Sequence, residues 1–204
     1  MKKTTLIIAL CALALPSMAQ KAKKKSNTAA KTAQEVVPET PPKILEEINR
    51  LTPMHHNLQQ WSGHWKDEMK VWSGENPEPN IYLLEKEGRV ACEGKLLMRN
   101  ISGRISTGPY EAYETINYDN LKRKFVKTWF DNLGTNILVL EGALDEKTNT
   151  LVFEGTTIDP LTMQTIKVRQ VLHIQDPENQ LLEVFVQYKD EKPLKTMEVK
   201  STRK

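Results

Sequence analysis

Cysteine is nearly absent from this 204-residue chain, which contains only two. Cys11 lies in the N-terminal apolar run, so a chain that loses this run keeps Cys92 alone. An exported protein with one cysteine has no internal disulfide and depends on its hydrophobic core for stability. A nucleophilic Cys92 would require a general base beside it. The segment from Val90 to Gly94 has the pattern of a strand instead, so we expect a buried structural thiol.

Long apolar runs are also lacking, apart from the stretch from Leu6 to Leu15. Lys2 and Lys3 precede it and the small residues of 16–19 follow, which predicts a signal peptide over residues 1–19 with cleavage before Gln20. About ten apolar residues are too few to span a bilayer. Acylation of Cys11 is disfavoured, because Leu10 stands where a lipoprotein signal has a small residue. We therefore predict an exported protein, periplasmic or secreted, without a transmembrane segment.

Residues 20–42 contain almost nothing that could build a core. Lysines alternate there with Ala, Ser, Asn and Thr and are followed by prolines, which predicts a disordered linker. Whether these lysines hold an anionic membrane surface or only solvate a tether stays open. Eight of the 29 basic and two of the 26 acidic residues precede Ile44, which leaves 21 basic and 24 acidic residues. This balance gives no support for nucleic-acid binding, and residues 43–204 have the length of one domain.

Signatures of catalysis and of metal binding are missing from the sequence as well. It contains no nucleophile elbow, phosphate loop or metal triad. His55 and His56 are adjacent, so on a helix they point roughly 100° apart, and no Cys or carboxylate completes a zinc site with His64. We expect no cofactor and no metal.

Turns that begin with Asp are what the chain has in abundance. Asp and Asn side chains bond the backbone two residues on, so these turns at regular spacing predict an up-and-down antiparallel meander. The turns are 119–120, 131–132, 145–149, 159–160, 176–179 and 190–193. The strands expected between them are 63–73, 79–89, 91–101, 107–118, 123–130, 135–144, 150–158, 164–174, 180–189 and 194–203. Closure into an all-β barrel of about ten strands would remove the sheet edges.

Helical spacing precedes the strands. Ile44, Leu45, Ile48 and Leu51 predict a first short helix, and Thr52 followed by Pro53 predicts a second one that ends near Trp61. Alternation also assigns faces within three of the strands. The residues that share one face are Trp65, Met69 and Val71 in the first strand, Ile166, Val168, Leu172 and Ile174 in the eighth, and Met197, Val199, Ser201 and Arg203 in the last.

Several stretches resemble known families. The opening from Leu58 to Trp65, with Gly63-His-Trp65, resembles the Gly-x-Trp signature of calycins, which are lipocalin-like barrels. More closely, the chain from about Leu58 onward resembles the bacterial secreted family called domain of unknown function 1579. The stretches that carry this resemblance are 94–97, 117–119, 129–135, 141–142 with Asp145, 159–162 and 197–204. It implies a lipocalin-like fold and no activity. Lys95 stands where that family tends to have Arg, which puts any pocket contact of that Arg in doubt.

The calycin resemblance also implies how the barrel closes. In such barrels the Trp of the opening motif packs at the closed end against an Arg of the final strand. Trp65 and Arg203 each share a face with the apolar residues of their own strand, whereas a shift of one residue would put either side chain outside. We therefore predict that Arg203 lies over Trp65, beside Gly63, where the first and last strands pair.

The leading functional hypothesis is a noncatalytic carrier or sensor that holds a small apolar or amphipathic molecule inside the barrel. The candidate contacts are Tyr110, Tyr118, Phe125 and Trp129, although these rings would equally fill a closed interior. The alternative is an interaction module of the envelope with a filled barrel. Its sign would be an outward apolar stripe, and we expect the leading helices to cover the outer face of strand 123–130.

An enzyme and a haem protein are the remaining alternatives. Glu114 and Glu141 alternate in step with apolar residues, so both are expected to point inward as a ligand anchor or as an acid or base with a raised pKa. His173, in the eighth expected strand, is the candidate haem ligand. It alternates against Leu172 and Ile174, which places it on the outer face and disfavours ligation of a haem.

Overall fold

The computed structural model describes residues 42–73 and 77–204. The described chain from Pro42 onward belongs to one compact unit, Thr40–Lys204. The predicted signal peptide, residues 1–19, and the predicted linker, apart from Pro42, lie outside the described residues. Among the described residues, no helix has the length and apolar character needed to cross a membrane.

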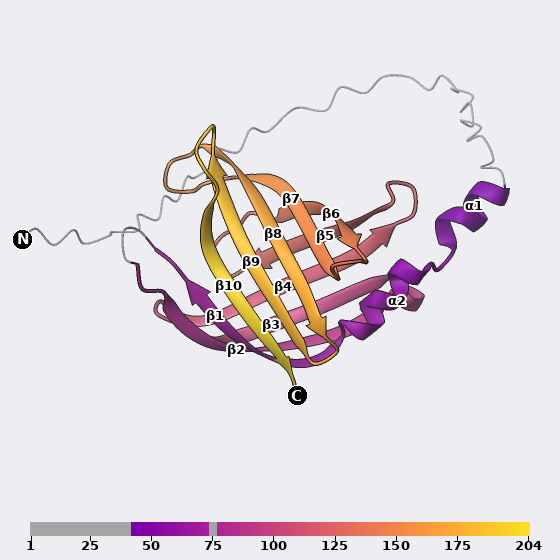
Figure 1. Cartoon of the computed structure of the whole chain (residues 1–204), viewed down its shortest axis with the longest axis horizontal. Coiled ribbons are helices and arrows are strands. Elements are labelled where there is room, and N and C mark those ends of the chain that lie inside the picture. Colours follow the sequence, from indigo (N-terminus) through magenta and orange to yellow (C-terminus); the bar gives the residue numbers. More distant parts are fainter. Residues whose placement is uncertain (1–41, 74–76) are drawn as a thin grey trace, which may run out of the picture. The chain divides into compact units, whose positions relative to one another are not determined.

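Ten antiparallel strands form a closed barrel in which each strand pairs with its neighbours in sequence and the first pairs with the last (Figure 1). The predicted all-β fold class and the number of strands are confirmed. The predicted bounds of the seventh and tenth strands match those of the structure. The strands are β1 (Gly63–Val71), β2 (Asn80–Ala91), β3 (Leu96–Ile105), β4 (Gly108–Asp119), β5 (Lys124–Asp131), β6 (Leu138–Asp145), β7 (Thr150–Ile158), β8 (Thr165–Asp176), β9 (Asn179–Tyr188) and β10 (Leu194–Arg203).

The Asp residues of the turns act as predicted. In five turns the carboxylate Oδ1 accepts a hydrogen bond from the backbone N–H two residues further on, which holds the chain in its reversal. These carboxylates belong to Asp119, Asp131, Asp145, Asp159 and Asp176. Local side-chain chemistry therefore sets the places where the meander turns.

The barrel closes at the junction of β1 and β10, where Trp65 and Arg203 are register partners. The Arg203 Cζ lies 4.2 Å from the centroid of the fully buried Trp65 ring. Arg203 also donates hydrogen bonds from Nη1 to the Ser62 carbonyl (2.8 Å) and from Nε to the Pro177 carbonyl (3.0 Å). The predicted contact between Trp65 and Arg203 is therefore present, and it ties the first and last strands to the segment before β1.

Two short helices precede the barrel, α1 (Pro42–Asn49) and α2 (Pro53–Gln60). Leu58 of α2 and the following Trp61 are buried in one core cluster with Phe125, and the rings of Trp61 and Phe125 lie 5.5 Å apart. The helix α2 contacts β2, β3 and β4. The expectation that these helices cover the outer face of β5 is therefore wrong. Leu58 and Trp61 find deeper burial inside the end of the barrel than an outer face would provide.

The connection between β2 and β3 also differs from expectation. Residues Cys92–Gly94 form a short 3-10 turn, η1, in which Cys92 and Glu93 have φ values of 51° and 56°. Cys92 is exposed, so the prediction of a strand that buries its thiol is wrong. Non-glycine residues seldom adopt positive φ, and the sequence carries no signal for it here.

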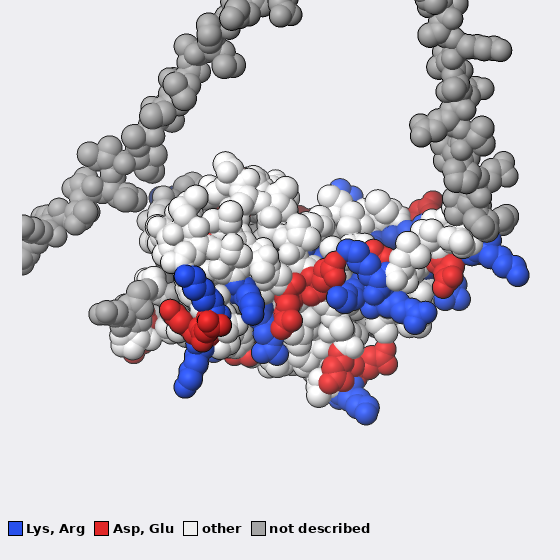
Figure 2. Space-filling model, turned by 90° about the horizontal axis from the view of Figure 1, so that it is seen from above, with Lys and Arg blue, Asp and Glu red and all other residues white. Residues whose placement is uncertain are grey.

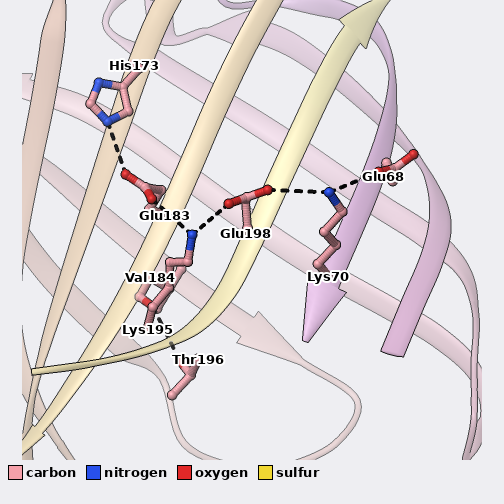
Figure 3. A network of polar contacts seen from close by, with 8 residues as sticks. All are labelled: Glu68, Lys70, His173, Glu183, Val184, Lys195, Thr196 and Glu198. Atoms are coloured by element: carbon pink, nitrogen blue, oxygen red, sulfur yellow. Dashed lines mark hydrogen bonds and ion pairs between the residues drawn. The ribbon is translucent and has the colours of Figure 1, made fainter. Parts of the chain in front are cut away.

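An ion-pair network crosses the outer surface of β8, β9, β10 and β1 (Figure 3). His173 Nε2 lies 3.3 Å from Glu183, which pairs with Lys195 (3.2 Å). Lys195 lies 2.7 Å from Glu198, and Glu198 lies 3.6 Å from Lys70 of β1. His173 thus lies on the outside, as its alternation predicted. The ion pair between Lys70 and Glu198 joins β1 to β10 on the outer face, whereas Trp65 and Arg203 join the same two strands on the other face.

Candidate functional site

The interior of the barrel holds a cavity of about 590 Å³. It extends to the end of the barrel opposite α2, which we call the mouth. The loops 106–107, 132–137, 159–164 and 189–193 lie at this end, together with residues 72–73 and 77–79 of the β1–β2 connection. Most of the lining side chains are aliphatic or aromatic, and they come from all ten strands and two mouth loops. Apolar members include Met69, Leu84, Ile101, Ile116, Leu133, Leu138, Ile166, Val168, Leu172, Leu182, Val184 and Val199.

Six neighbouring strands each place one buried charged or serine side chain on the cavity wall, and we call these side chains the polar belt; Gln180 of β9 and Gln170 of β8 are buried on the same wall. All of them are at least nine-tenths buried. On β3 and β4 the belt residue lies between a residue of the core cluster under α2 and a residue of the cluster near the mouth. The members are Ser201 (β10), Asp67 (β1), Lys86 (β2), Arg99 (β3), Glu114 (β4) and Lys127 (β5).

Two groups of contacts join the polar belt. Lys86 Nζ donates a hydrogen bond to Ser201 Oγ (2.7 Å) and forms an ion pair with Asp67 Oδ1 (3.0 Å). Glu114 lies between two cations, with Oε1 2.6 Å from Lys127 Nζ and Oε2 3.2 Å from Arg99 Nη1. Arg99 Nη2 donates to the Trp61 carbonyl (2.9 Å). The belt therefore also anchors the segment that closes the barrel beneath it.

Burial and these neighbours set the charge states of the belt. Burial works to raise the pKa of Glu114, but the adjacent Lys127 and Arg99 outweigh it and lower the pKa to about 2. Burial lowers the pKa of Lys86 to about 8, although Asp67 opposes this shift. Glu114 is therefore a fixed carboxylate at neutral pH. The expected raised pKa is wrong for this residue, because its charge partners are stronger than its desolvation.

Three of the six residues predicted to contact a ligand line the cavity: Tyr110, Glu114 and Trp129. Tyr110 and Trp129 share a partner near the mouth, Asp131. The Asp131 Oδ2 accepts a hydrogen bond from Trp129 Nε1 (3.0 Å) and lies 3.5 Å from the Tyr110 hydroxyl. Burial, with Asp131 nearby, raises the pKa of Tyr110 well above its usual value. These contacts fix both rings on the wall of the cavity.

Tyr118 and Phe125 do not line the cavity. Their rings lie 5.0 Å apart at the end of the barrel under α2, and Tyr118 also meets the ring of His55 at 5.7 Å. Phe125 is fully buried against Trp61. The prediction that these two rings contact a ligand is wrong, because α2 covers them and they fill the closed end.

Glu141 lies on the outer surface, where it pairs with Lys122 (2.6 Å) and Lys124 (3.2 Å). The expectation of an inward Glu141 is wrong. Its neighbours Ile137 and Val139 are exposed by 63% and 51%, so the residues whose alternation it follows also face outward. Leu140 and Gly142 take the inward positions of β6. Apolar residues on both faces of this strand leave alternation ambiguous.

The sequence reasoning missed most of the polar belt. Asp67 stands between Trp65 and Met69, two residues correctly placed on the inner face, and Arg99 stands in the same way between Leu97 and Ile101. The signal was therefore available, because strict alternation carries an intervening charged residue inward with its neighbours. Lys95, by contrast, does not line the cavity.

His55 and His173 make contacts that stabilise the fold. His55 Nδ1 accepts a hydrogen bond from the backbone N–H of Thr52 (3.1 Å) and so caps α2. Burial lowers the pKa of His55. Over residues 42–73 and 77–204, no group of three or more His, Cys, Asp or Glu side chains could hold a metal ion. His173, the haem candidate, lies in the outer network and not in the cavity.

Charge is distributed unevenly over the outside. Seen from above, an area without Lys, Arg, Asp or Glu lies beside a band of interspersed charges (Figure 2). Exposed apolar side chains of the mouth loops are Leu133, Ile137, Leu161 and Met163, and Leu194 begins β10 after the last of these loops. The cavity thus reaches an end of the barrel whose loops expose these apolar side chains together with the charged residues Lys189, Asp190, Glu191 and Lys192.

Solved structures of two natural proteins resemble this barrel. Rv2717c from M. tuberculosis is 14% identical with a TM-score of 0.51, and the match covers 76% of this chain and 99% of that one. The S-type phycobiliprotein lyase CPES from Guillardia theta is 9% identical with a TM-score of 0.50, covering 81% of this chain and 98% of that one. At these identities the likeness concerns the fold alone. A comparison with curated protein sequences gives no match.

A family model covers the whole barrel. It matches residues 50–203, which include α2, all ten strands and both partners of the contact between Trp65 and Arg203. The residues that resembled this family in the sequence lie within the matched range, apart from Lys204. The chain belongs to the family described as protein of unknown function DUF1579.

Proposed function

We propose that this protein is an exported, noncatalytic carrier or sensor that holds one small apolar or amphipathic molecule inside its barrel. The observation that supports this proposal is the cavity of about 590 Å³ with its largely apolar wall. Its volume falls within the range of roughly 300–1,000 Å³ that is typical of small-molecule sites. A barrel built only for stability would fill this volume with side chains, because an empty apolar cavity forfeits packing.

The residue chemistry disfavours an enzyme. Glu114, the inward acid or base candidate, has a pKa of about 2 and pairs with two cations, so it has no proton to donate at neutral pH. Cys92 is exposed in a turn away from the cavity. Noncatalytic binding requires neither group to react.

Binding of an uncharged fluorescent probe such as Nile red tests the proposal. We expect saturable binding with a stoichiometry of one, together with a discrete small-molecule mass in native mass spectra of protein purified from its own host. Val184→Trp should fill the cavity and abolish probe binding, because Val184 lines it. Val139→Trp is the matched control, since Val139 faces outward. Absence of saturable binding by the wild-type protein would contradict the proposal.

The alternative of an interaction module has one observation in its favour. Tyr113 and Phe130 are cross-strand partners on the outer face and are exposed by 50% and 41%, and Val139 of the next strand is exposed as well. This is the outward apolar stripe that the alternative required. The same native mass spectra discriminate the two functions, because a module would carry a protein partner and no small molecule. Sequencing of the mature N-terminus, expected at Gln20, tests export.

A further inference from the structure

The polar belt carries unequal numbers of positive and negative charges. It contains three cations, Lys86, Arg99 and Lys127, and two carboxylates, Asp67 and Glu114. Asp67 is matched by Lys86 (3.0 Å), whereas Glu114 is shared by Arg99 and Lys127 (3.2 and 2.6 Å). One positive charge in the belt therefore has no carboxylate of its own.

Asp131 is the other carboxylate on the cavity wall, and it lies near the mouth. It follows Lys127 by four residues along β5, which is about 13 Å of extended strand. Its oxygens already accept hydrogen bonds from Trp129 Nε1 and from the backbone N–H of Leu133. Asp131 is thus engaged at the opposite end of the cavity from Arg99 and does not balance the belt.

Hydrogen-bonding capacity is also left over at the belt. Arg99 Nε is the one donor among the buried atoms of the cavity wall that have no hydrogen-bond partner within the described residues. The others are acceptors: Gln170 Oε1, Gln180 Oε1 and Asp67 Oδ1, of which the last is in an ion pair with Lys86. Arg99 is only 4% exposed, and its side chain lies on the wall of the cavity. Buried donors are nearly always paired, and a buried charge without a counter-charge is costly. A ligand atom that both accepts a hydrogen bond and carries negative charge would satisfy Arg99 and offset the extra cation together.

The wall between the belt and the mouth requires that the ligand also have an apolar part. Met69, Leu84, Ile101 and Val199 form one apolar cluster there. Ile105, near the mouth, follows Arg99 by six residues along β3, which is about 20 Å of strand. A molecule that meets both regions must be charged at one end and apolar along the rest of its length.

We propose that the ligand is an aliphatic monocarboxylate whose head group binds Arg99 and Lys127 in the polar belt and whose chain lies along the apolar wall toward the mouth. This inference rests on the proposed carrier function and specifies its ligand. The carboxylate accepts a hydrogen bond from Arg99 Nε. It also adds a second negative charge beside Arg99 and Lys127, which otherwise share Glu114 alone. An aliphatic amine would instead add a fourth positive charge to the belt.

Three amphiphiles that share one chain and differ in the head group test the inference: dodecanoic acid, dodecanol and dodecylamine. Each is titrated against wild-type protein loaded with Nile red at pH 7. We expect the acid to displace the probe with an affinity at least about tenfold higher than the alcohol, the order of effect of a charge-assisted hydrogen bond. The amine should bind most weakly. Equal affinities for acid and alcohol, or a preference for the amine, would overturn the inference while the carrier function stands. Failure of Nile red itself to bind would remove the carrier function.

Two belt variants should move the preference in opposite directions. Lys127→Met leaves one cation for Glu114, so the ratio of acid to alcohol affinity should fall toward one. Glu114→Gln adds one net positive charge, so this ratio should rise. Both variants break the same ion pair, and general structural damage would change the ratio in the same direction for both. Lys70→Met removes a cation of the outer network instead and should leave the ratio unchanged. A change in the same direction in both belt variants would contradict the head-group site. The head-group preference of the wild-type protein decides the matter even if a variant fails to fold.

Discussion

Arg203 occupies the space into which any side chain at Gly63 would grow. A Cβ atom built on Gly63 would lie 2.7 Å from Arg203 Nη1, and Gly63 has φ = 101°, a conformation that side chains disfavour. The glycine and the tryptophan of the Gly-x-Trp opening therefore serve the same arginine. Gly63 leaves room for the guanidinium, and Trp65 provides the ring on which it lies.

Gly63→Ala should destabilise the protein by about 1–3 kcal/mol, because strain at positive φ adds to the crowding of Arg203. Gly108→Ala is the matched control. Gly108 also has a positive φ of 134°, but its added Cβ would meet nothing within 4 Å. Urea denaturation of the two variants separates crowding from backbone strain. Equal losses in both would show that crowding of Arg203 by the added methyl group costs nothing beyond the backbone strain.

Arg203→Lys should lower the free energy of unfolding by about 1–2 kcal/mol. A lysine keeps the charge but cannot stack as a planar guanidinium over Trp65 or reach the Ser62 and Pro177 carbonyls together. Arg169→Lys is the control, because Arg169 forms an exposed pair with Glu154 on the outer face. Thermal denaturation compares the two, and an unchanged midpoint for Arg203→Lys would contradict the closing role.

Trp129→Ala should weaken binding of Nile red by ~1–3 kcal/mol, as expected for the loss of a buried aromatic contact. Trp129 lines the cavity, whereas Trp72 does not and instead lies 5.2 Å from Lys195 Nζ. Trp72→Ala is therefore the matched control and should retain the affinity of the wild-type protein. Fluorescence titration gives both values. If Trp129→Ala folds and binds as the wild-type protein does, the probe does not occupy this part of the cavity.

The strands could be predicted from the sequence because their limits are set locally. The strand 150–158 lies between turns that begin with Asp145 and Asp159, and its bounds were correct. The turn at Cys92 and Glu93 could not be predicted, because its positive φ angles arise in residues that seldom adopt them. Tertiary context decides such a conformation.

The site was harder to predict than the fold, because its residues violate the usual rule that charges face water. Lys127 lies between Phe125 and Trp129 along β5, and all three point inward. Alternation alone indicates this placement, but only the closed barrel shows that Glu114 is close enough to compensate the charge. The predicted inward orientation of Glu141 was wrong for the opposite reason, since the apolar residues that it alternates with face outward.

The buried amine of Lys86 gives the barrel a distinctive dependence on pH. Desolvation lowers its pKa to about 8 from the usual 10.5, despite Asp67 beside it, so the unfolded chain binds the proton more tightly than the folded protein does. The free energy of unfolding should therefore rise between about pH 8 and pH 10.5, with a contribution of at most about 3 kcal/mol. The charged groups that face Lys86 are Asp67, Arg99 and Glu114, and Ser201 Oγ accepts its hydrogen bond.

Urea denaturation at intervals from pH 7.5 to 10.5 measures this effect against a variant without the buried pair, Asp67→Asn with Lys86→Met. Outer lysines act with the opposite sign. A hydrogen bond with Glu198 raises the pKa of Lys195, so its contribution to stability is lost as the pH rises through that raised value. The double variant retains these outer groups, and subtracting its profile isolates the interior pair. A difference that stays flat across this range, or that decreases with pH, would show that Lys86 is not held at a cost inside the barrel.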